Sequence, residues 1–154
     1  MKKIKTKIKN SGFVILFAVT LSAILLSVAL GVANIAVKEI KFGTSTKDTN
    51  DAFFAADTGA ECALFNDKTT STIFVPSPSA MPCLGRVVAV SENPASVWSF
   101  SLFGLGPEGK GCANVTVDKT TTPTKITSLG YNNSGALGCS PGLNTVERQV
   151  ELNY

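Results

Sequence analysis

The stretch FVILFAVTLSAILLSVALGVANIAV, residues 13–37, determines how this chain is organised. It contains no Asp, Glu, Lys or Arg. A helix rises about 1.5 Å per residue, so about 20 residues cross the roughly 30 Å hydrocarbon layer of a membrane. The few polar residues inside it, such as Thr20 and Asn34, cost little beside its many Leu, Ile and Val residues. We therefore predict a membrane-spanning helix over residues 13–37.

The charges on either side of this segment predict its orientation. Only Lys38 and Lys41 closely follow it, with Glu39 between them. The segment is preceded by five lysines, Lys2, Lys3, Lys5, Lys7 and Lys9. Because positive charge is retained on the cytoplasmic side, we expect the N-terminus in the cytoplasm and everything after about residue 38 outside.

Two kinds of processing are compatible with such an N-terminus. A secretory signal has an apolar core of roughly 7 to 15 residues followed by a small-residue cut site. The core is too long here, yet the pairs Ser27/Ala29 and Ala29/Gly31 leave removal of the whole segment open. The other possibility is a cut after Gly12. It would make Phe13 the first residue and keep the apolar helix on the mature protein.

Three parts of the sequence resemble one bacterial family. The row KNSGFVIL, residues 9–16, is similar to the prepilin-type leader of type IV pilins and type II secretion pseudopilins. The row NDAFFAADTGAE, residues 50–61, is similar to the stretch in which the family's long first helix continues. The rows ANVTV (113–117), TSLGYN (127–132) and VERQVEL (146–152) look like the C-terminal sheet of PilX-like minor pilins, the members that the chain resembles most.

The resemblance implies an α+β fold, in which a long N-terminal helix packs on a C-terminal antiparallel β-sheet head. The expected parts are a leader (1–12), a transmembrane and filament-core helix (13–37), an amphipathic continuation (38–66) and a β-rich head (67–154). Gly12 and Phe13 would flank the cut made by a prepilin peptidase, with N-methylation of Phe13. The expected partners are other pilin subunits, bound through the helix. The expected location is the cytoplasmic membrane and then a cell-surface filament.

Phe17 departs from the family pattern. Major pilins usually carry Glu five residues after the cut, where it neutralises the α-amine of a neighbouring subunit in an apolar surrounding. Phe17 cannot do so. We therefore favour a minor subunit at a filament tip, where no further amine has to be docked. The alternative is that Phe is tolerated at this position and says nothing about location.

The rest of the chain predicts one head domain. Gly43-Thr44-Ser45-Thr46 consists of poor helix formers and is expected to loosen or kink the helix. An amphipathic stripe follows, Ala52, Phe53, Ala56, Ala60, Ala63 and Leu64, with its apolar side toward a core. After Asn66, prolines mark a loop-rich stretch, and five runs are typical of antiparallel strands, 86–91, 96–103, 113–120, 124–132 and 145–154. Phe103 and Trp98 break the alternation of their run, so that strand is either central and buried on both faces, or bulged.

The four cysteines predict disulfides, because the head is placed outside the cytoplasmic membrane. Four cysteines allow three connectivities, of which we favour Cys62 with Cys83 and Cys112 with Cys139; reduced core cysteines are the alternative. The chain has no His, and no C-x₂-C spacing occurs, so we expect no metal site and no cofactor.

The composition argues against catalysis and nucleic-acid binding. Without His, the usual proton shuttle and triad base are missing. Asp57 and Glu61 fit a solvated helix face better than an acid–base pair, and residues 104–111 lack the P-loop spacing. After a cut at Gly12 the side chains would carry a net charge of −2, which does not favour phosphate binding. We expect no enzyme.

Three functions remain: a pilin-like structural subunit, a single-pass membrane-anchored adhesin or binding domain, or a protein secreted after loss of the hydrophobic segment.

Overall fold

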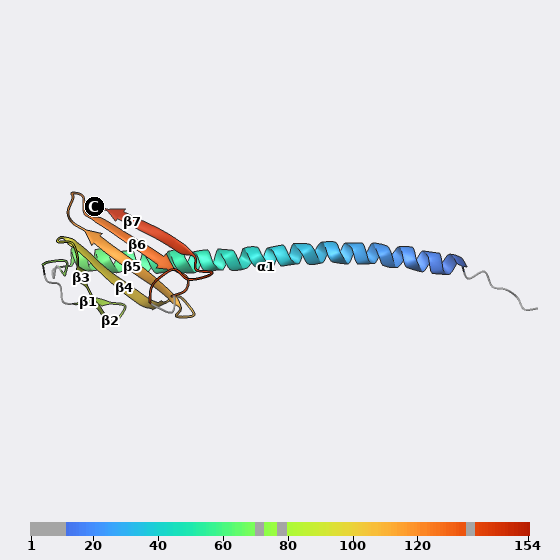
Figure 1. Cartoon of the computed structure of the whole chain (residues 1–154), viewed down its shortest axis with the longest axis horizontal. Helices are drawn as coiled ribbons and strands as arrows, with labels where there is room; N and C mark the ends of the chain where they lie inside the picture. Colours follow the sequence, from blue (N-terminus) through green and yellow to red (C-terminus); the bar gives the residue numbers. More distant parts are fainter. Residues whose placement is uncertain (1–11, 70–72, 77–79, 135–137) are drawn as a thin grey trace, which may run out of the picture. The chain divides into compact units, whose positions relative to one another are not determined.

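The structure is a computed structural model that describes residues 12–69, 73–76, 80–134 and 138–154. Its elements are α1 (Gly12–Lys68), β1 (Ala80–Cys83), β2 (Arg86–Ala89), β3 (Ser91–Glu92), β4 (Val97–Leu105), β5 (Gly111–Asp118), β6 (Lys125–Tyr131) and β7 (Glu147–Asn153). They form two compact units, Met1–Gly43 and Thr44–Tyr154. In the second unit, the C-terminal part of α1 packs on an antiparallel sheet (Figure 1). The expected α+β arrangement is therefore confirmed.

Helix α1 is continuous through the residues that were expected to loosen it. Gly43, Thr44, Ser45 and Thr46 are all helical, and α1 ends at Lys68. Gly costs about 1 kcal/mol in a helix interior and Ser or Thr less. These costs are spread over a long helix with good formers on both sides, so they do not interrupt the helix at these residues.

The sheet is a meander in which consecutive strands are neighbours. Its order is β3-β4-β5-β6-β7, with every pair antiparallel. In β4, Trp98, Phe100 and Leu102 are buried and alternate with more exposed residues. A register shift between Phe103 and Leu105 marks a bulge, so of the two residues that break the alternation, Phe103 lies at the irregularity and Trp98 does not.

Two strand predictions need correction. The run 86–91 is not one strand, because Val90 interrupts it and separates β2 from β3. Strand β1 was expected to be loop because it contains Pro82. Pro82 is opposite Val87 in the β1–β2 hairpin, where β1 pairs only with β2 among the described strands. An edge strand tolerates proline because one side of its backbone needs no partner.

Helix and sheet approach so closely that only small residues fit between them. A Cβ built on Gly59 would lie 2.5 Å from Ser128 Oγ and 2.7 Å from Val115 Cγ2. A Cβ on Gly130 would lie well inside van der Waals contact with the backbone of α1 at Ala52 and Ala56. We call this contact the helix–sheet seam, formed by Ala52, Ala56, Gly59, Ala60, Ala63, Ser128 and Gly130.

The seam corrects one part of the predicted stripe. Phe53 was expected in the core, yet its side chain is 47% exposed, and Phe54 is also exposed. Ala55, at 2% exposure, is buried instead. Because the backbones of α1 and β6 nearly touch, no phenylalanine fits on the contact face of the helix.

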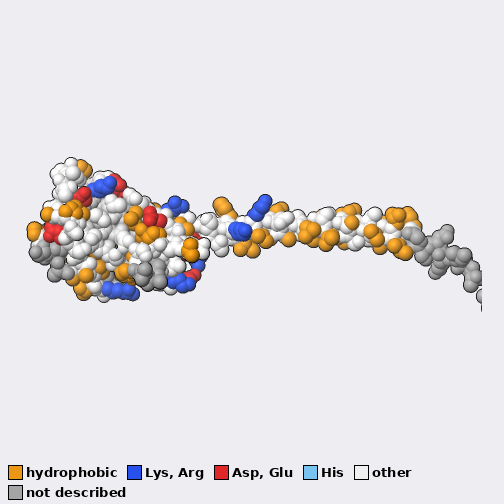
Figure 2. Space-filling model, in the orientation of Figure 1, with side chains coloured by type: hydrophobic (Ala, Val, Ile, Leu, Met, Phe, Trp, Pro, Cys, Tyr) orange, Lys and Arg blue, Asp and Glu red, His pale blue; other side chains and the backbone are white. Residues whose placement is uncertain are grey.

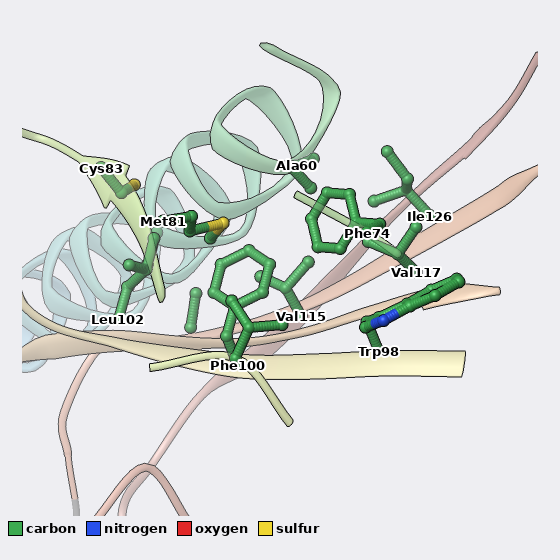
Figure 3. Close-up of a cluster of buried hydrophobic side chains, with 14 of the residues drawn as sticks. Ala60, Phe74, Met81, Cys83, Trp98, Phe100, Leu102, Val115, Val117 and Ile126 are labelled. Atoms are coloured by element: carbon green, nitrogen blue, oxygen red, sulfur yellow. The ribbon is translucent and has the colours of Figure 1, made fainter. Parts of the chain in front are cut away.

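Larger side chains fill the space beside the seam. Figure 3 shows Phe74, Trp98 and Phe100 between the sheet and the helix, with Met81 of β1 beside them. The ring centroid of Phe74 lies 6.0 Å from that of Trp98 and 6.4 Å from that of Phe100. Trp98 Nε1 donates a hydrogen bond to Val75 O at 3.2 Å, which satisfies the one polar group of the indole.

The seam yields a stability prediction. Gly130→Ala places a methyl group against the backbone of α1, so we expect the free energy of unfolding to fall by about 3 kcal/mol. Gly43→Ala is the matched control. It has no atom within 4 Å of the added Cβ and should be neutral or stabilising by up to about 1 kcal/mol. Chemical denaturation followed by the fluorescence of Trp98 measures both. Equal free energies of unfolding for the two variants would contradict the close approach of α1 and β6 at Gly130.

Candidate functional site

The N-terminal unit of α1 has the surface of a membrane segment. This helix is long and apolar enough to cross a membrane by length and composition. Its large apolar side chains are exposed, for example Phe13 at 78% and Leu26 at 64%. Figure 2 shows hydrophobic side chains on the surface along this N-terminal part of α1.

Hydroxyl groups in this segment satisfy their hydrogen bonds within the helix. Thr20 Oγ1 donates to Phe17 O at 2.9 Å, Ser22 Oγ to Val19 O at 2.9 Å, and Ser27 Oγ to Ile24 O at 2.8 Å. A polar group without a partner in hydrocarbon costs several kcal/mol. Because each of the three hydroxyl groups has a hydrogen-bond acceptor within the helix, these residues are compatible with a lipid surrounding.

The predicted processing site is at the first described residues. Gly12 begins α1, and Phe13 is the first residue of its apolar run. The five lysines and the remainder of the expected leader, residues 1–11, are outside the described residues. Phe17 is 59% exposed, on the surface of the helix.

Two disulfides join the pairs that the sequence analysis favoured. Cys62 of α1 is bonded to Cys83 of β1, and Cys112 of β5 to Cys139. Asn66 reinforces the first bridge, because its Nδ2 donates to Cys62 O at 2.8 Å and to Pro82 O at 3.0 Å. Asn66 is only 1% exposed, so these bonds hold the β1–β2 hairpin against the helix in a dry surrounding.

A cluster of charged and aromatic groups connects the end of α1 to the sheet. The carboxylate of Asp67, whose side chain is 8% exposed, forms an ion pair with Lys119 Nζ. The hydroxyl of Tyr154 donates to the other carboxylate oxygen, and Lys68 Nζ lies 4.0 Å from the Tyr154 ring centroid. Burial, and then the hydrogen bond to Asp67, raise the pKa of Tyr154. No local sequence pattern predicts this cluster, because its members are far apart along the chain.

A second, exposed charge cluster connects α1 to the β4–β5 turn. Glu108 accepts from Lys47 Nζ at 2.6 Å and from Lys110 Nζ at 2.9 Å. The hydrogen bonds from Lys47 and Lys110 lower the pKa of Glu108 to about 2. All three side chains are more than half exposed, so water screens the pairs and their contribution to stability is small.

Several weaker sequence candidates have ordinary structural positions. Asn114, the first residue of the triplet Asn-Val-Thr that is typical of glycosylation acceptors, is half-buried. Its Nδ2 donates to Cys139 O at 2.7 Å, and its Oδ1 accepts from Ser101 Oγ. Residues 106–110 form the turn between β4 and β5. Glu61 is exposed on α1, and Asp57, one turn before it, is half-buried. Within the described ranges, no group of three His, Cys, Asp or Glu side chains could hold a metal ion.

No protein-family model, curated protein or solved structure matches this chain.

The Tyr154–Asp67 bond predicts a pH dependence. The folded protein holds the phenol protonated above its ordinary pKa of 10, so this stabilisation is complete below pH 10 and is lost as the pH rises further. Tyr154→Phe should lower the free energy of unfolding by about 2 kcal/mol near neutral pH, and the difference from wild type should shrink above pH 10. In an Asp67→Asn background, the same change should have little effect. A constant difference across the range would contradict this prediction.

Proposed function

We propose that this chain is a minor pilin or pseudopilin, a structural subunit that inserts in the cytoplasmic membrane and then assembles into, or primes, a type IV pilus-like filament. Its N-terminus faces the cytoplasm and its head lies outside. A prepilin peptidase removes residues 1–12, and the amine of Phe13 is methylated. The mature subunit contacts other pilin subunits through α1.

One observation carries this proposal. A single helix contains both an apolar segment suited to a membrane and, further along, the face that packs on the sheet of the head. Cleavage beside Gly12 leaves this helix whole, whereas cleavage near Ala29 or Gly31 divides it. A helix that extends from a lipid-compatible segment into a folded head supports lateral assembly through helices better than it supports a freely diffusing domain.

A structural role also fits the head better than catalysis. The chain has no histidine. Asp67 and Glu108 are each held by a lysine, and these ion pairs hold separate segments of the head together. We therefore propose that the head serves assembly or binding. The membrane-anchored adhesin remains the second candidate, and the mature N-terminus with the shear assay below distinguishes it from a filament subunit.

The processing site gives the first test. Intact-mass analysis of the mature protein should show a chain that starts at Phe13 with a methylated amine, and shearing should release it from the cell surface. Gly12→Val should retain residues 1–12 and abolish release, because the leader glycine is lost. Gly31→Ala, in the same helix, should be processed normally. An intact Met1 or a start near Leu30 would contradict the pilin proposal, and correct processing without shear release would favour the adhesin.

Phe17 gives a second test. If no further amine has to be docked above this subunit, immunogold labelling should appear at filament tips. Phe17→Glu supplies the missing negative charge and should allow incorporation along the shaft, whereas Phe17→Leu should remain at the tip. Labelling along the shaft for the unmodified protein would refute the tip position.

A further inference from the structure

Neither disulfide joins α1 to the five-stranded sheet. One bridge connects α1 to β1, which pairs only with β2 among the described strands, and the other connects β5 to the segment between β6 and β7. The last turn of α1 contacts the sheet through the carboxylate of Asp67. This carboxylate binds Lys119, directly after β5, and Tyr154, directly after β7.

The Asp67–Lys119 pair lies in a largely apolar surrounding. The side chain of Asp67 is 8% exposed and that of Lys119 is 26% exposed. Lys119 Nζ lies 5.8 Å from the ring centroid of Phe74 and 5.7 Å from that of Trp98, and both rings are buried. Burial disfavours both charges, and the transfer of one proton from Nζ to the carboxylate removes both. The result is an amine in contact with a carboxylic acid, the two groups from which an amide forms.

The backbone holds these side chains at fixed positions on the sheet. Lys119 N donates to Ser96 O at 2.9 Å. Tyr154 N donates to Thr124 O at 3.1 Å, and Thr124 N donates to Tyr154 O at 3.0 Å. Contact between held groups replaces a bimolecular reaction with a unimolecular one, an advantage of about 10⁵ to 10⁸ M when the groups are well oriented. This advantage favours condensation of Asp67 with Lys119 over reaction between free groups in water.

The two carboxylate oxygens of Asp67 have different partners. Oδ1 contacts Lys119 Nζ, and Oδ2 accepts a hydrogen bond from the hydroxyl of Tyr154. Attack of an amine on Cγ places negative charge on a carboxylate oxygen, and a hydrogen-bond donor already aimed at that oxygen stabilises the charge. The phenol of Tyr154 is such a donor for Oδ2, which leaves Oδ1 as the oxygen to be lost.

We propose that Asp67 and Lys119 condense to an amide, a covalent crosslink between the end of α1 and the sheet. The Nζ–Cγ bond forms and the Cγ–Oδ1 bond breaks. Two of the three ammonium protons move to Oδ1, which leaves as water, and the third stays on the amide nitrogen. Oδ2 becomes the amide carbonyl oxygen, and Tyr154 keeps its proton. The ion pair in the structure is the reactant of this step, and the step needs no oxidant, no second reactant and no filament assembly.

Mass spectrometry of the purified full chain, reduced and denatured, tests the crosslink. We expect the wild-type chain to be lighter by one water than a chain without the amide. Trypsin should release a branched peptide that joins residues 48–68 to residues 111–125, because trypsin does not cleave after an acylated Lys119.

Lys119→Arg is the matched control. It retains the positive charge, but a guanidinium stays protonated and cannot attack the carboxyl group, so this variant should have the full mass and give no branched peptide. The exposed pair Lys47–Glu108 is a control within the wild-type chain. Its side chains are 56% and 53% exposed, and the peptides that contain them should stay unjoined.

Tyr154→Phe tests the role of the phenol. The variant loses the donor to Oδ2, so we expect the crosslinked mass to accumulate roughly a hundredfold more slowly after induction than in wild type. Fluorescence of Trp98 checks that the head is folded. The comparison of wild type with Lys119→Arg stands independently if Tyr154→Phe does not fold.

Three results would overturn the crosslink. The first is a wild-type chain of full mass. The second is a missing water without a branched peptide, which would indicate a succinimide at Asp67 instead. The third is a missing water that Lys119→Arg retains. Crosslinking of a folded Tyr154→Phe variant at the wild-type rate would overturn the role of the phenol.

Discussion

The fold of the head depends on the close approach of α1 to β5 and β6. With Gly59 over Ser128 and Gly130 against the backbone at Ala56, the helix and sheet meet with almost no side chain between them. This distance accounts for the run of alanines on the contact face and for the outward position of Phe53. It also means that bulky groups fill the core from the side, where Phe74, Trp98 and Met81 close the space beneath the β1–β2 hairpin.

The same helix meets two different surroundings, and its sequence is suited to each. In the N-terminal unit, large aliphatic side chains are exposed and the Thr20 and Ser22 hydroxyls bond to the preceding turn, so polarity is satisfied locally. In the second unit, small residues of the helix pack on the sheet instead. Cys62 and Asn66 bind the helix to β1 through a disulfide and a hydrogen bond. Continuity through Gly43 follows because propensity costs are small beside the hydrogen bonding of a long helix.

The strongly periodic features could be predicted from the sequence, and those that depend on long-range contacts could not. The uncharged run 13–37, the alternation of Val115 and Val117, and the general α+β arrangement are local patterns. The position of Phe53 was predicted wrongly because two glycines that bring the backbones together belong to different elements. The Asp67–Lys119–Tyr154 cluster was missed for the same reason: nothing local marks residues that meet only after the sheet has formed.

The disulfide connectivity has a consequence for biogenesis. Each bridge joins neighbouring cysteines along the chain, with separations of 21 and 27 residues. In the proposed orientation the N-terminus stays in the cytoplasm, and the residues next to the membrane segment cross first. Cys62 and Cys83 would then reach the oxidising compartment before Cys112 and Cys139, so the order of export would favour the pairs that the structure has.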